Sequence, residues 1–508
     1  MRLESSIKNT VSSVFMQIVI MLIGLVLPRL YLTSFGSEIN GLVSSITQFI
    51  GYFVLVEAGL SSATTNALYK PLAEGDPIAI NRVLAATRKF YYEIGYIFTG
   101  LVFALAVIYP LFISTGSLNR IEIGILVIVI GLNGTIDFFT LAKYRTLVTA
   151  NQKYYIVANA TSIAYIVNFV FIFIVIKLSC SIIIVRVVAL TMYILRSLIL
   201  NIYVKRHYKF IKHNVEPDKH ALNKRWDAMI LQFLGLTQTS MPAIILTIFS
   251  KDLKVVSVYS IYYLVASSII NIMMIAPSSF AASFGEMIAK KEVESFRKAF
   301  SQYELSFFMG MTAVYSCVNI MYISFIRIYT ADVTDINYIL PTVALLFVIN
   351  GISYNIYTPA GTLIGSAGVY KETKTGSIIQ TIIAISLYFV LTPLYGIVGV
   401  LIALIVSNVY RDFDLIIFMS RNVNGVPYQK SLLRALGCCI AFAICNVPFW
   451  FFIGIEPNNF MFWCVQAFGV FIWCIVATIC FFWLFEREQL KAIFSRGMLI
   501  LNKRKRSV

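Results

Sequence analysis

Long apolar blocks constrain the fold of this chain more than any other feature. Blocks of about eighteen or more mostly apolar residues recur, for example at 11–32, 94–113, 155–176, 182–204 and 460–485. At about 1.5 Å per residue, each block is long enough as a helix to cross about 30 Å of hydrocarbon. Strands of a membrane β-barrel would instead show short segments of alternating polarity. The sequence therefore predicts an all-α polytopic membrane protein.

The apolar blocks predict about fourteen transmembrane helices. We expect the spans at 10–33, 39–60, 91–113, 121–142, 155–177, 181–204, 227–249, 255–280, 304–327, 338–360, 376–393, 396–416, 431–453 and 461–485. The first block is too long for a signal peptide and has no A-x-A-like cleavage site, so we expect it to be retained as the first span.

The distribution of basic residues predicts the orientation of the chain. The net charge is +17, and lysine and arginine concentrate in the segments at 205–225 and 487–506 and in the shorter loops on the same side. Because cytoplasmic loops are enriched in these residues, we expect both termini in the cytoplasm and an even number of spans. No folded domain outside the membrane is predicted, so we expect no nucleic-acid partner.

Short sequence similarities between the two halves predict an internal duplication. The segment that begins at Leu68 resembles the one that begins at Phe284, and Leu147 and Tyr154 match Leu363 and Tyr370, each pair 216 residues apart. A constant offset indicates two parallel six-helix lobes, an arrangement that suits alternating access to a substrate site between the lobes. We expect these domains: an N-terminal six-helix lobe at 1–204, a basic cytoplasmic linker at 205–226, a C-terminal six-helix lobe at 227–420, two additional helices at 421–485 and a basic cytoplasmic tail at 486–508.

The important candidates among the charged residues inside the predicted spans are Arg29, Glu57, Asp137, Arg186 and Arg196. A charge at mid-span costs at least about 2.5 kcal/mol, so these side chains are expected to face a cavity or a partner. All five are in the first lobe, and we expect no comparable charge in the span interiors of the second lobe. We therefore expect the first lobe to contain the charged residues that act on the substrate.

Arginine and tyrosine together favour a phosphorylated sugar as the substrate. Guanidinium groups bind phosphate oxygens in pairs, and aromatic rings stack on the apolar faces of sugars. The candidate substrate residues are Arg29, Arg186, Arg196, Tyr193, Tyr354 and Tyr357, with Lys143 and Arg145 at the cytoplasmic entrance.

Each candidate charge also has a structural alternative. Arg29 lies near the end of its span and is placed to extend toward the membrane surface. Glu57 has basic loop residues as possible partners. Asp137 is either the partner of Arg196 or a coupling site for H⁺ or Na⁺.

No pattern typical of an enzyme is present. The sequence has no Walker motif, its three histidines all lie in the basic segment at 207–220, and its eight cysteines form no C-x-x-C motif. We expect no catalytic residues, no metal site and no cofactor. Transport would be driven by an ion gradient or would be passive.

Three short motifs carry a resemblance to a known family. They are FGSEING at 35–41, EAGLSSA at 57–63 and LYKPLAEGD at 68–76. With the two-lobe layout, they resemble the Wzx-type polysaccharide flippases of the multidrug/oligosaccharidyl-lipid/polysaccharide exporter superfamily. The resemblance implies transfer of an undecaprenyl-diphosphate-linked oligosaccharide repeat unit across the bacterial inner membrane, for capsule, O-antigen or exopolysaccharide synthesis.

The resemblance also implies a cationic central cavity, with which Arg29, Arg186 and Arg196 are compatible. It implies membrane lipids, a polysaccharide polymerase and glycosyltransferases as partners. Three other functions remain open: a cation-coupled multidrug or metabolite antiporter, a peptidoglycan-precursor flippase, and a membrane scaffold without transport activity. Three intramembrane arginines against two carboxylates favour an anionic cargo over a cationic one.

Overall fold

The computed structural model describes residues 2–57, 60–211, 215–218, 233–250, 252–451, 457, 459–493 and 495. All regular structure among these residues is helical, and no strand occurs in them. The chain forms two compact units, unit 1 at Met1–Ser260 and unit 2 at Ile261–Val508. Each unit is described by itself below.

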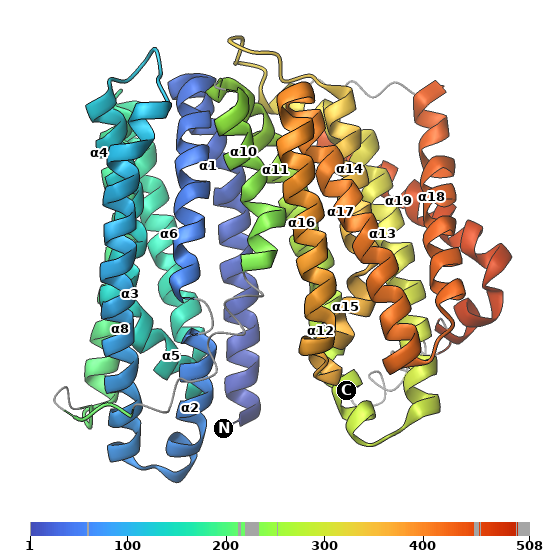
Figure 1. The fold of residues 1–508 in the computed structure, drawn as a ribbon, viewed down its shortest axis with the longest axis horizontal. Helices are drawn as coiled ribbons and strands as arrows, with labels where there is room; N and C mark the ends of the chain where they lie inside the picture. Colours follow the sequence, from blue (N-terminus) through green and yellow to red (C-terminus); the bar gives the residue numbers. More distant parts are fainter. Residues whose placement is uncertain are drawn as a thin grey trace. The chain divides into compact units, whose positions relative to one another are not determined.

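Unit 1 is a bundle of long helices (Figure 1). Its helices are α1 (Arg2–Phe53), η1 (Val54–Glu57), α2 (Leu60–Glu74), α3 (Pro77–Phe112), α4 (Arg120–Ile136), η2 (Asp137–Leu141), α5 (Ala142–Ala150), α6 (Tyr154–Lys177), α7 (Ile182–Ala189), α8 (Thr191–His207), α10 (Met241–Ser250) and the first turns of α11 (Leu253–Met273).

The α1 segment consists of two helices that meet at Gly36. This residue has φ 78° and ψ 174°, a combination that only glycine adopts without strain. The chain rises before this point and descends after it in Figure 1. The break therefore lets one continuous stretch supply two limbs of the bundle.

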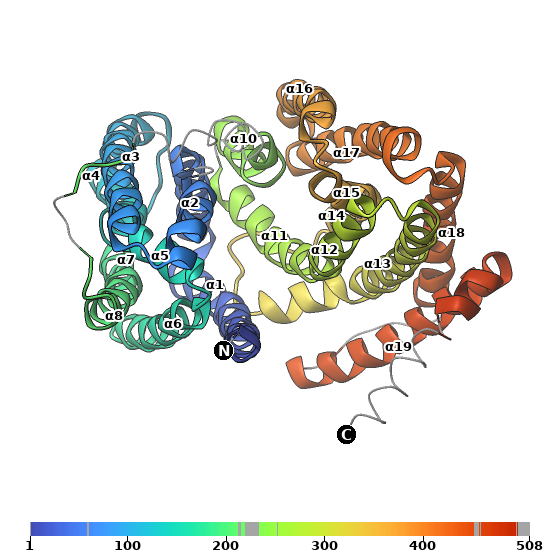
Figure 2. The same cartoon turned by 90° about the horizontal axis from the view of Figure 1, so that it is seen from below.

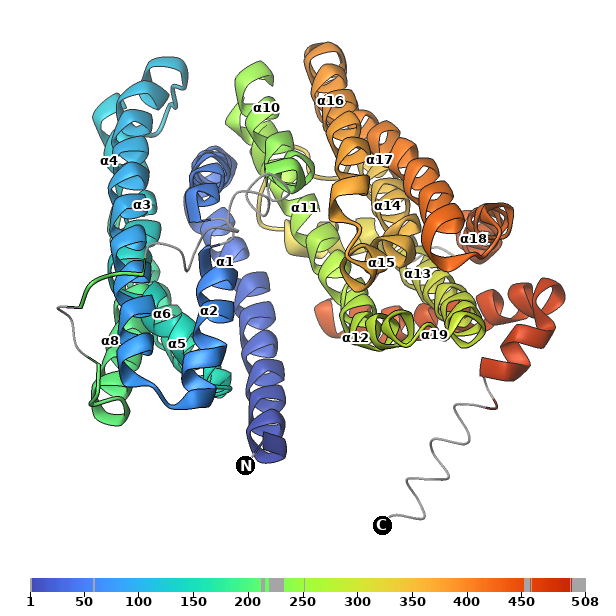
Figure 3. The ribbon, with the colours of Figure 1, turned by 60° about the horizontal axis from the view of Figure 1, so that its bottom comes forward.

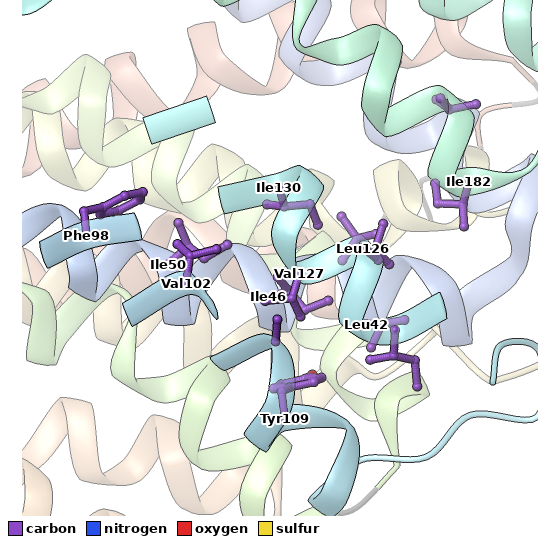
Figure 4. Packing of buried hydrophobic residues seen from close by; sticks show 14 of the residues in the cluster. Leu42, Ile46, Ile50, Phe98, Val102, Tyr109, Leu126, Val127, Ile130 and Ile182 are labelled. Carbon is purple, nitrogen blue, oxygen red and sulfur yellow. The ribbon is translucent and has the colours of Figure 1, made fainter. Parts of the chain in front are cut away.

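The core of unit 1 lies between the second limb of α1 and helices α3 and α4. Leu42, Ile46 and Ile50 of α1 belong to one buried cluster with Val102 of α3 and Leu126 of α4 (Figure 4). On α4, an added Cβ at Gly131 would collide with Val102, and one at Gly134 would collide with the Phe98 ring. Small residues at these positions allow α3 and α4 to approach closely, as is common between membrane helices.

A buried hydroxyl group ties α10 to the same core. Ser45 Oγ on α1 accepts hydrogen bonds from the Tyr109 hydroxyl on α3 at 2.9 Å and from Thr247 Oγ1 on α10 at 2.8 Å. All three side chains are buried. Hydrogen bonds of this kind hold helices together in a hydrocarbon environment, where water is absent.

Unit 2 is also helical throughout its described residues. Its elements are the remainder of α11, α12 (Ile275–Ala289), α13 (Val293–Tyr329), α14 (Pro341–Ile356), α15 (Thr358–Ala367), α16 (Tyr370–Tyr395), α17 (Ile397–Met419), η3 (Ser420–Asn424), α18 (Tyr428–Phe451) and α19 (Phe460–Phe485). Figure 2 shows α18 and α19 beside α13, and Figure 3 shows α16 running along α17.

The helix boundaries repeat at the offset found in the loops. Helix α3 begins at Pro77 and α13 begins 216 residues later, at Val293. The same interval separates the starts of α5 and α15, and those of α6 and α16. Three helix pairs with a common offset are consistent with a duplicated unit.

The chain is a multi-pass membrane protein with eleven candidate spans among its described residues, or up to twelve if one bent pair counts as a single span. That pair, 233–239 and 241–250, is bent by 55°. The predicted first and second spans both fall in α1, and α17 carries three charged residues: Arg411, Asp412 and Asp414. The number of about fourteen spans and the cytoplasmic termini stay predictions.

Residues 212–214 and 219–226 of the predicted linker at 205–226, and the part of the predicted tail beyond residue 495, lie outside the described residues. The predicted domain boundaries likewise stay predictions.

Candidate functional site

Four of the predicted charged residues meet in unit 1. Asp137 Oδ1 accepts a hydrogen bond from Arg196 Nη2 at 2.6 Å, and Asp137 Oδ2 lies 3.6 Å from Arg145 Nη1. Arg145 Nη2 in turn donates to Glu57 Oε1 at 2.8 Å. We call these four residues the unit 1 charge cluster. Two guanidinium groups and two carboxylates alternate in it, so its formal charge is zero.

Each member of the cluster comes from a different element. Glu57 is the last residue of η1, and Asp137 is the first residue of the π-helical turn η2. Arg145 lies on α5 and Arg196 on α8. A π-helical turn inserts an extra residue into a helix and is frequent at functional sites. Here it joins α4 to α5, which places Asp137 and Arg145 on successive segments of one nearly continuous helix.

Tyrosine side chains support both ends of the cluster. The Tyr91 hydroxyl on α3 donates to Glu57 Oε1 at 3.0 Å. At the other end, the guanidinium carbon of Arg196 lies 5.4 Å from the centre of the Tyr193 ring. A cation over an aromatic face is stabilised without being neutralised. Arg196 therefore has one carboxylate partner and one aromatic partner.

The charge cluster is only partly shielded from solvent. Side-chain exposure is 27% for Arg145, 15% for Glu57 and 14% for each of Asp137 and Arg196. Removing one partner from such a group leaves an uncompensated charge in a poorly hydrated place, which is strongly destabilising. The alternating charges therefore stabilise one another's positions.

Arg186 occupies a separate place in unit 1. Its guanidinium carbon lies 4.3 Å from the centre of the Tyr31 ring on α1. No ion pair to Arg186 occurs among the described residues, and its buried Nε has no hydrogen-bond partner in them. The cation is therefore held by an aromatic face and not by a carboxylate.

Arg186 makes no observed contact with the charge cluster among the described residues. Arg186 is on α7, whereas Tyr193 and Arg196 are on α8, and Leu190 separates the two helices. Arg29 is half-buried on α1. The side chain of Lys143 lies outside the described residues.

In unit 2 the two predicted tyrosines lie at a helix break. Tyr354 is on α14, and Tyr357 separates α14 from α15. Their rings pack edge to face with centres 5.5 Å apart. What these tyrosines bind stays a prediction, as do the substrate roles of the arginines in unit 1.

Near this break, three buried or half-buried amides form a ladder across α14, α16 and α17. Gln380 Nε2 donates to Asn408 Oδ1 at 3.0 Å, and Asn408 Nδ2 donates to Asn350 Oδ1 at 3.1 Å. One turn beyond Asn408, Asp412 is 5% exposed, and its Oδ1 has no hydrogen-bond partner among the described residues.

The expectation that the second lobe has no charge in its span interiors is wrong. Glu304 is 2% exposed, and Arg411 and Arg434 are each 3% exposed, all on helices of unit 2. Arg411 and Asp412 fall within the predicted span 396–416 of that lobe, and Arg434 falls within 431–453, one of the two additional helices. These charges are visible in the sequence but were not among the five candidates.

No group of three or more histidine, cysteine, aspartate or glutamate residues is placed to hold a metal ion within the described part of the chain.

No protein-family model matches this chain, and no curated protein matches it significantly. Solved structures do match. The lipid II flippase MurJ in an inward-closed conformation is 18% identical with a TM-score of 0.66, and the alignment covers 95% of this chain and 100% of that one.

Two multidrug transporters match as well. An inward-facing MATE family transporter of the MOP superfamily is 14% identical with a TM-score of 0.60, covering 81% of this chain and 94% of that one. The MATE multidrug transporter DinF-BH is 15% identical with a TM-score of 0.57, covering 83% of this chain and 96% of that one. At these identities the likeness is one of fold. The chain is thus an all-helical, multi-pass membrane protein with the fold of the MurJ flippase and the MATE transporters.

Proposed function

We propose that this protein is a flippase for a lipid-linked oligosaccharide. It would move an undecaprenyl-diphosphate-linked repeat unit from the cytoplasmic to the outer leaflet of the bacterial inner membrane by alternating access. The repeat unit would supply capsule, O-antigen or exopolysaccharide synthesis. The fold shared with MurJ and the MATE transporters supports a membrane transporter or flippase as the general class.

The observation that carries the proposal is the environment of Arg186. A guanidinium group in a span costs at least about 2.5 kcal/mol, and such a group normally pairs with a carboxylate. Arg186 has only the Tyr31 ring as an observed partner, and its Nε is left without a hydrogen bond among the described residues. A cation kept in this state favours an anionic ligand, such as a phosphate group, over a cationic drug.

The unit 1 charge cluster does not offset the preference of Arg186 for an anionic ligand. Its two carboxylates, Glu57 and Asp137, are already engaged by Arg145 and Arg196. They are therefore not available as the acidic site that a cation exporter needs.

Two other functions have an observation in their favour. The fold match to the lipid II flippase covers nearly the whole chain, which favours a peptidoglycan-precursor flippase. Asp412 Oδ1, which has no hydrogen-bond partner among the described residues, favours a cation-coupled multidrug or metabolite antiporter. Coupling to an H⁺ or Na⁺ gradient belongs to the proposal for a flippase as well as for an antiporter. Interaction with a polysaccharide polymerase and glycosyltransferases belongs to the first proposal alone.

The test is the leaflet distribution of prenyl-diphosphate-linked repeat units in cells with and without the protein. We expect the units to accumulate on the cytoplasmic face in its absence, with loss of surface polymer. Arg186→Gln is expected to reproduce that loss at normal membrane abundance. Arg120→Gln is the matched control, because Arg120 is an exposed arginine at the start of α4 in the same unit.

An unchanged leaflet distribution with altered drug efflux would contradict the flippase in favour of the antiporter. Accumulation of lipid II in place of polymer units would favour the peptidoglycan precursor as the cargo.

A further inference from the structure

The guanidinium groups of Arg145 and Arg196 converge on a single carboxylate, that of Asp137. The contact to Arg196 Nη2 is a short hydrogen bond of 2.6 Å. The contact to Arg145 Nη1, at 3.6 Å, is an ion pair that is too long for a hydrogen bond. One anion therefore lies between two cations and accepts a hydrogen bond from only one of them.

Bonding capacity remains around this carboxylate. The Nε of Arg196 is buried and has no hydrogen-bond partner in the part of the chain that the structure describes. A guanidinium group has five N–H donors, which match the several oxygens of a phosphate group better than the two of a carboxylate. Asp137 thus satisfies this pair of arginines incompletely.

Each of the two cations also has a partner other than Asp137. Arg145 retains its 2.8 Å hydrogen bond to Glu57, and Glu57 is held by the hydroxyl of Tyr91. Arg196 retains the face of the Tyr193 ring. The arginine pair therefore does not depend on Asp137 alone for its position.

We propose that Arg145 and Arg196 form a binding site for a phosphoryl anion, and that Asp137 occupies this site in the absence of the ligand. A phosphate or diphosphate group displaces the carboxylate and takes up the free donors of both arginines. This inference rests on the proposed function in one respect. The proposed function requires a prenyl-linked sugar diphosphate as the substrate, and the diphosphate of that substrate would be the anion that binds here.

The internal carboxylate has a defined consequence for affinity. A ligand that binds only the fraction of molecules in which its site is open has its apparent affinity reduced by that fraction. Removing the competing carboxylate therefore raises the affinity for a phosphoryl anion. In a purely structural ion-pair cluster, the same change would not create a site for pyrophosphate.

The experiment is calorimetric titration of the purified full-length chain with inorganic pyrophosphate. Asp137→Asn is expected to raise the affinity by about tenfold or more. Adding Arg196→Gln in that background is expected to abolish the gain, and Asp137→Glu, which keeps a carboxylate, is expected to stay close to the unmodified chain. Asp137→Ser gives a second reading if the asparagine variant does not fold.

The matched control is Asp414→Asn, which removes a carboxylate from an arginine pair in unit 2, that of Arg411 and Asp414. It is expected to leave pyrophosphate affinity unchanged. Equal or weaker affinity in Asp137→Asn, or no binding in any variant, would overturn the proposal.

A competition arm separates this inference from the proposed function. If a prenyl diphosphate in mixed micelles displaces pyrophosphate from Asp137→Asn, the lipid headgroup is the source of the anion. If only free pyrophosphate binds, the anion site stands while the lipid-linked substrate loses its support. If polymer units accumulate in cells lacking the protein but Asp137→Asn gains no affinity, the flippase stands and the role of Asp137 fails.

Discussion

Arg434 on α18 is bound by both Glu304 of α13 and Glu486, the residue that follows α19. Its Nε and Nη2 donate to the two carboxylate oxygens of Glu486 at 2.6 and 2.9 Å, and its Nη1 donates to Glu304 Oε2 at 2.8 Å. Nη2 also donates to Gln489 Oε1 at 2.7 Å. One buried side chain thus links α13, α18 and the segment after α19. This link makes the last two helices an integral part of unit 2.

Replacing Arg434 is expected to destabilise the protein. Arg434→Met leaves the buried Glu304 without its cation and Glu486 with only the 3.8 Å ion pair to Lys430, and breaking a buried ion pair costs about 3–5 kcal/mol. We expect a lower unfolding temperature and lower membrane abundance, measured by thermal unfolding in detergent and by immunoblot. Arg421→Met is the control, because Arg421 is an exposed arginine just before α18. Equal stability of the two variants would show that the link contributes nothing.

Gly36 is expected to tolerate no side chain without cost. Its φ of 78° with ψ of 174° lies in a region that is nearly restricted to glycine, and occupying it with another residue costs about 1–3 kcal/mol. Gly36→Ala should therefore lower the unfolding temperature. Gly24→Ala on the same segment is the control, since an added Cβ there meets nothing within 4 Å. A neutral Gly36→Ala would mean that the two limbs of α1 are joined in a different conformation.

The amide ladder of unit 2 gives a third prediction. Asn408→Ala removes one donor and one acceptor, so that Gln380 and Asn350 each lose a partner. An unsatisfied buried polar group costs about 1–3 kcal/mol. Thermal unfolding should therefore show a lower unfolding temperature for Asn408→Ala. Asn422→Ala provides the comparison, because Asn422 is exposed and bonds only to the backbone of Phe418 in the observed contacts. A larger effect at Asn422 would contradict the ladder.

The predicted orientation is open to direct labelling. Ser114, between α3 and α4, should face the outside, and Ala73 on α2 should face the cytoplasm. With the eight native cysteines replaced, a membrane-impermeant maleimide should label Ser114→Cys in intact cells and Ala73→Cys only after the membrane is opened. The reverse pattern would place both termini outside.

The sequence alone determined that the chain is a helical membrane protein, since only length and continuous apolar character are needed to predict a spanning helix. It also showed the 216-residue offset, because a duplication leaves matching residues such as Tyr154 and Tyr370 at a constant spacing. Charges inside the spans, Asp137 and Arg196 among them, were identified in the same way, since a charge in an apolar block stands out without any knowledge of its neighbours.

Which charges neutralise one another was decided by the tertiary structure. Arg145 was placed at the cytoplasmic entrance, yet it lies between Glu57 and Asp137, residues 88 and 8 positions away along the chain. Arg434 was not among the candidate charges, yet it is buried against Glu304 and Glu486. An ion pair depends on the distance between side chains from different helices. Helical periodicity describes only which residues share a face of one helix, so the partners become visible only when the helices are packed.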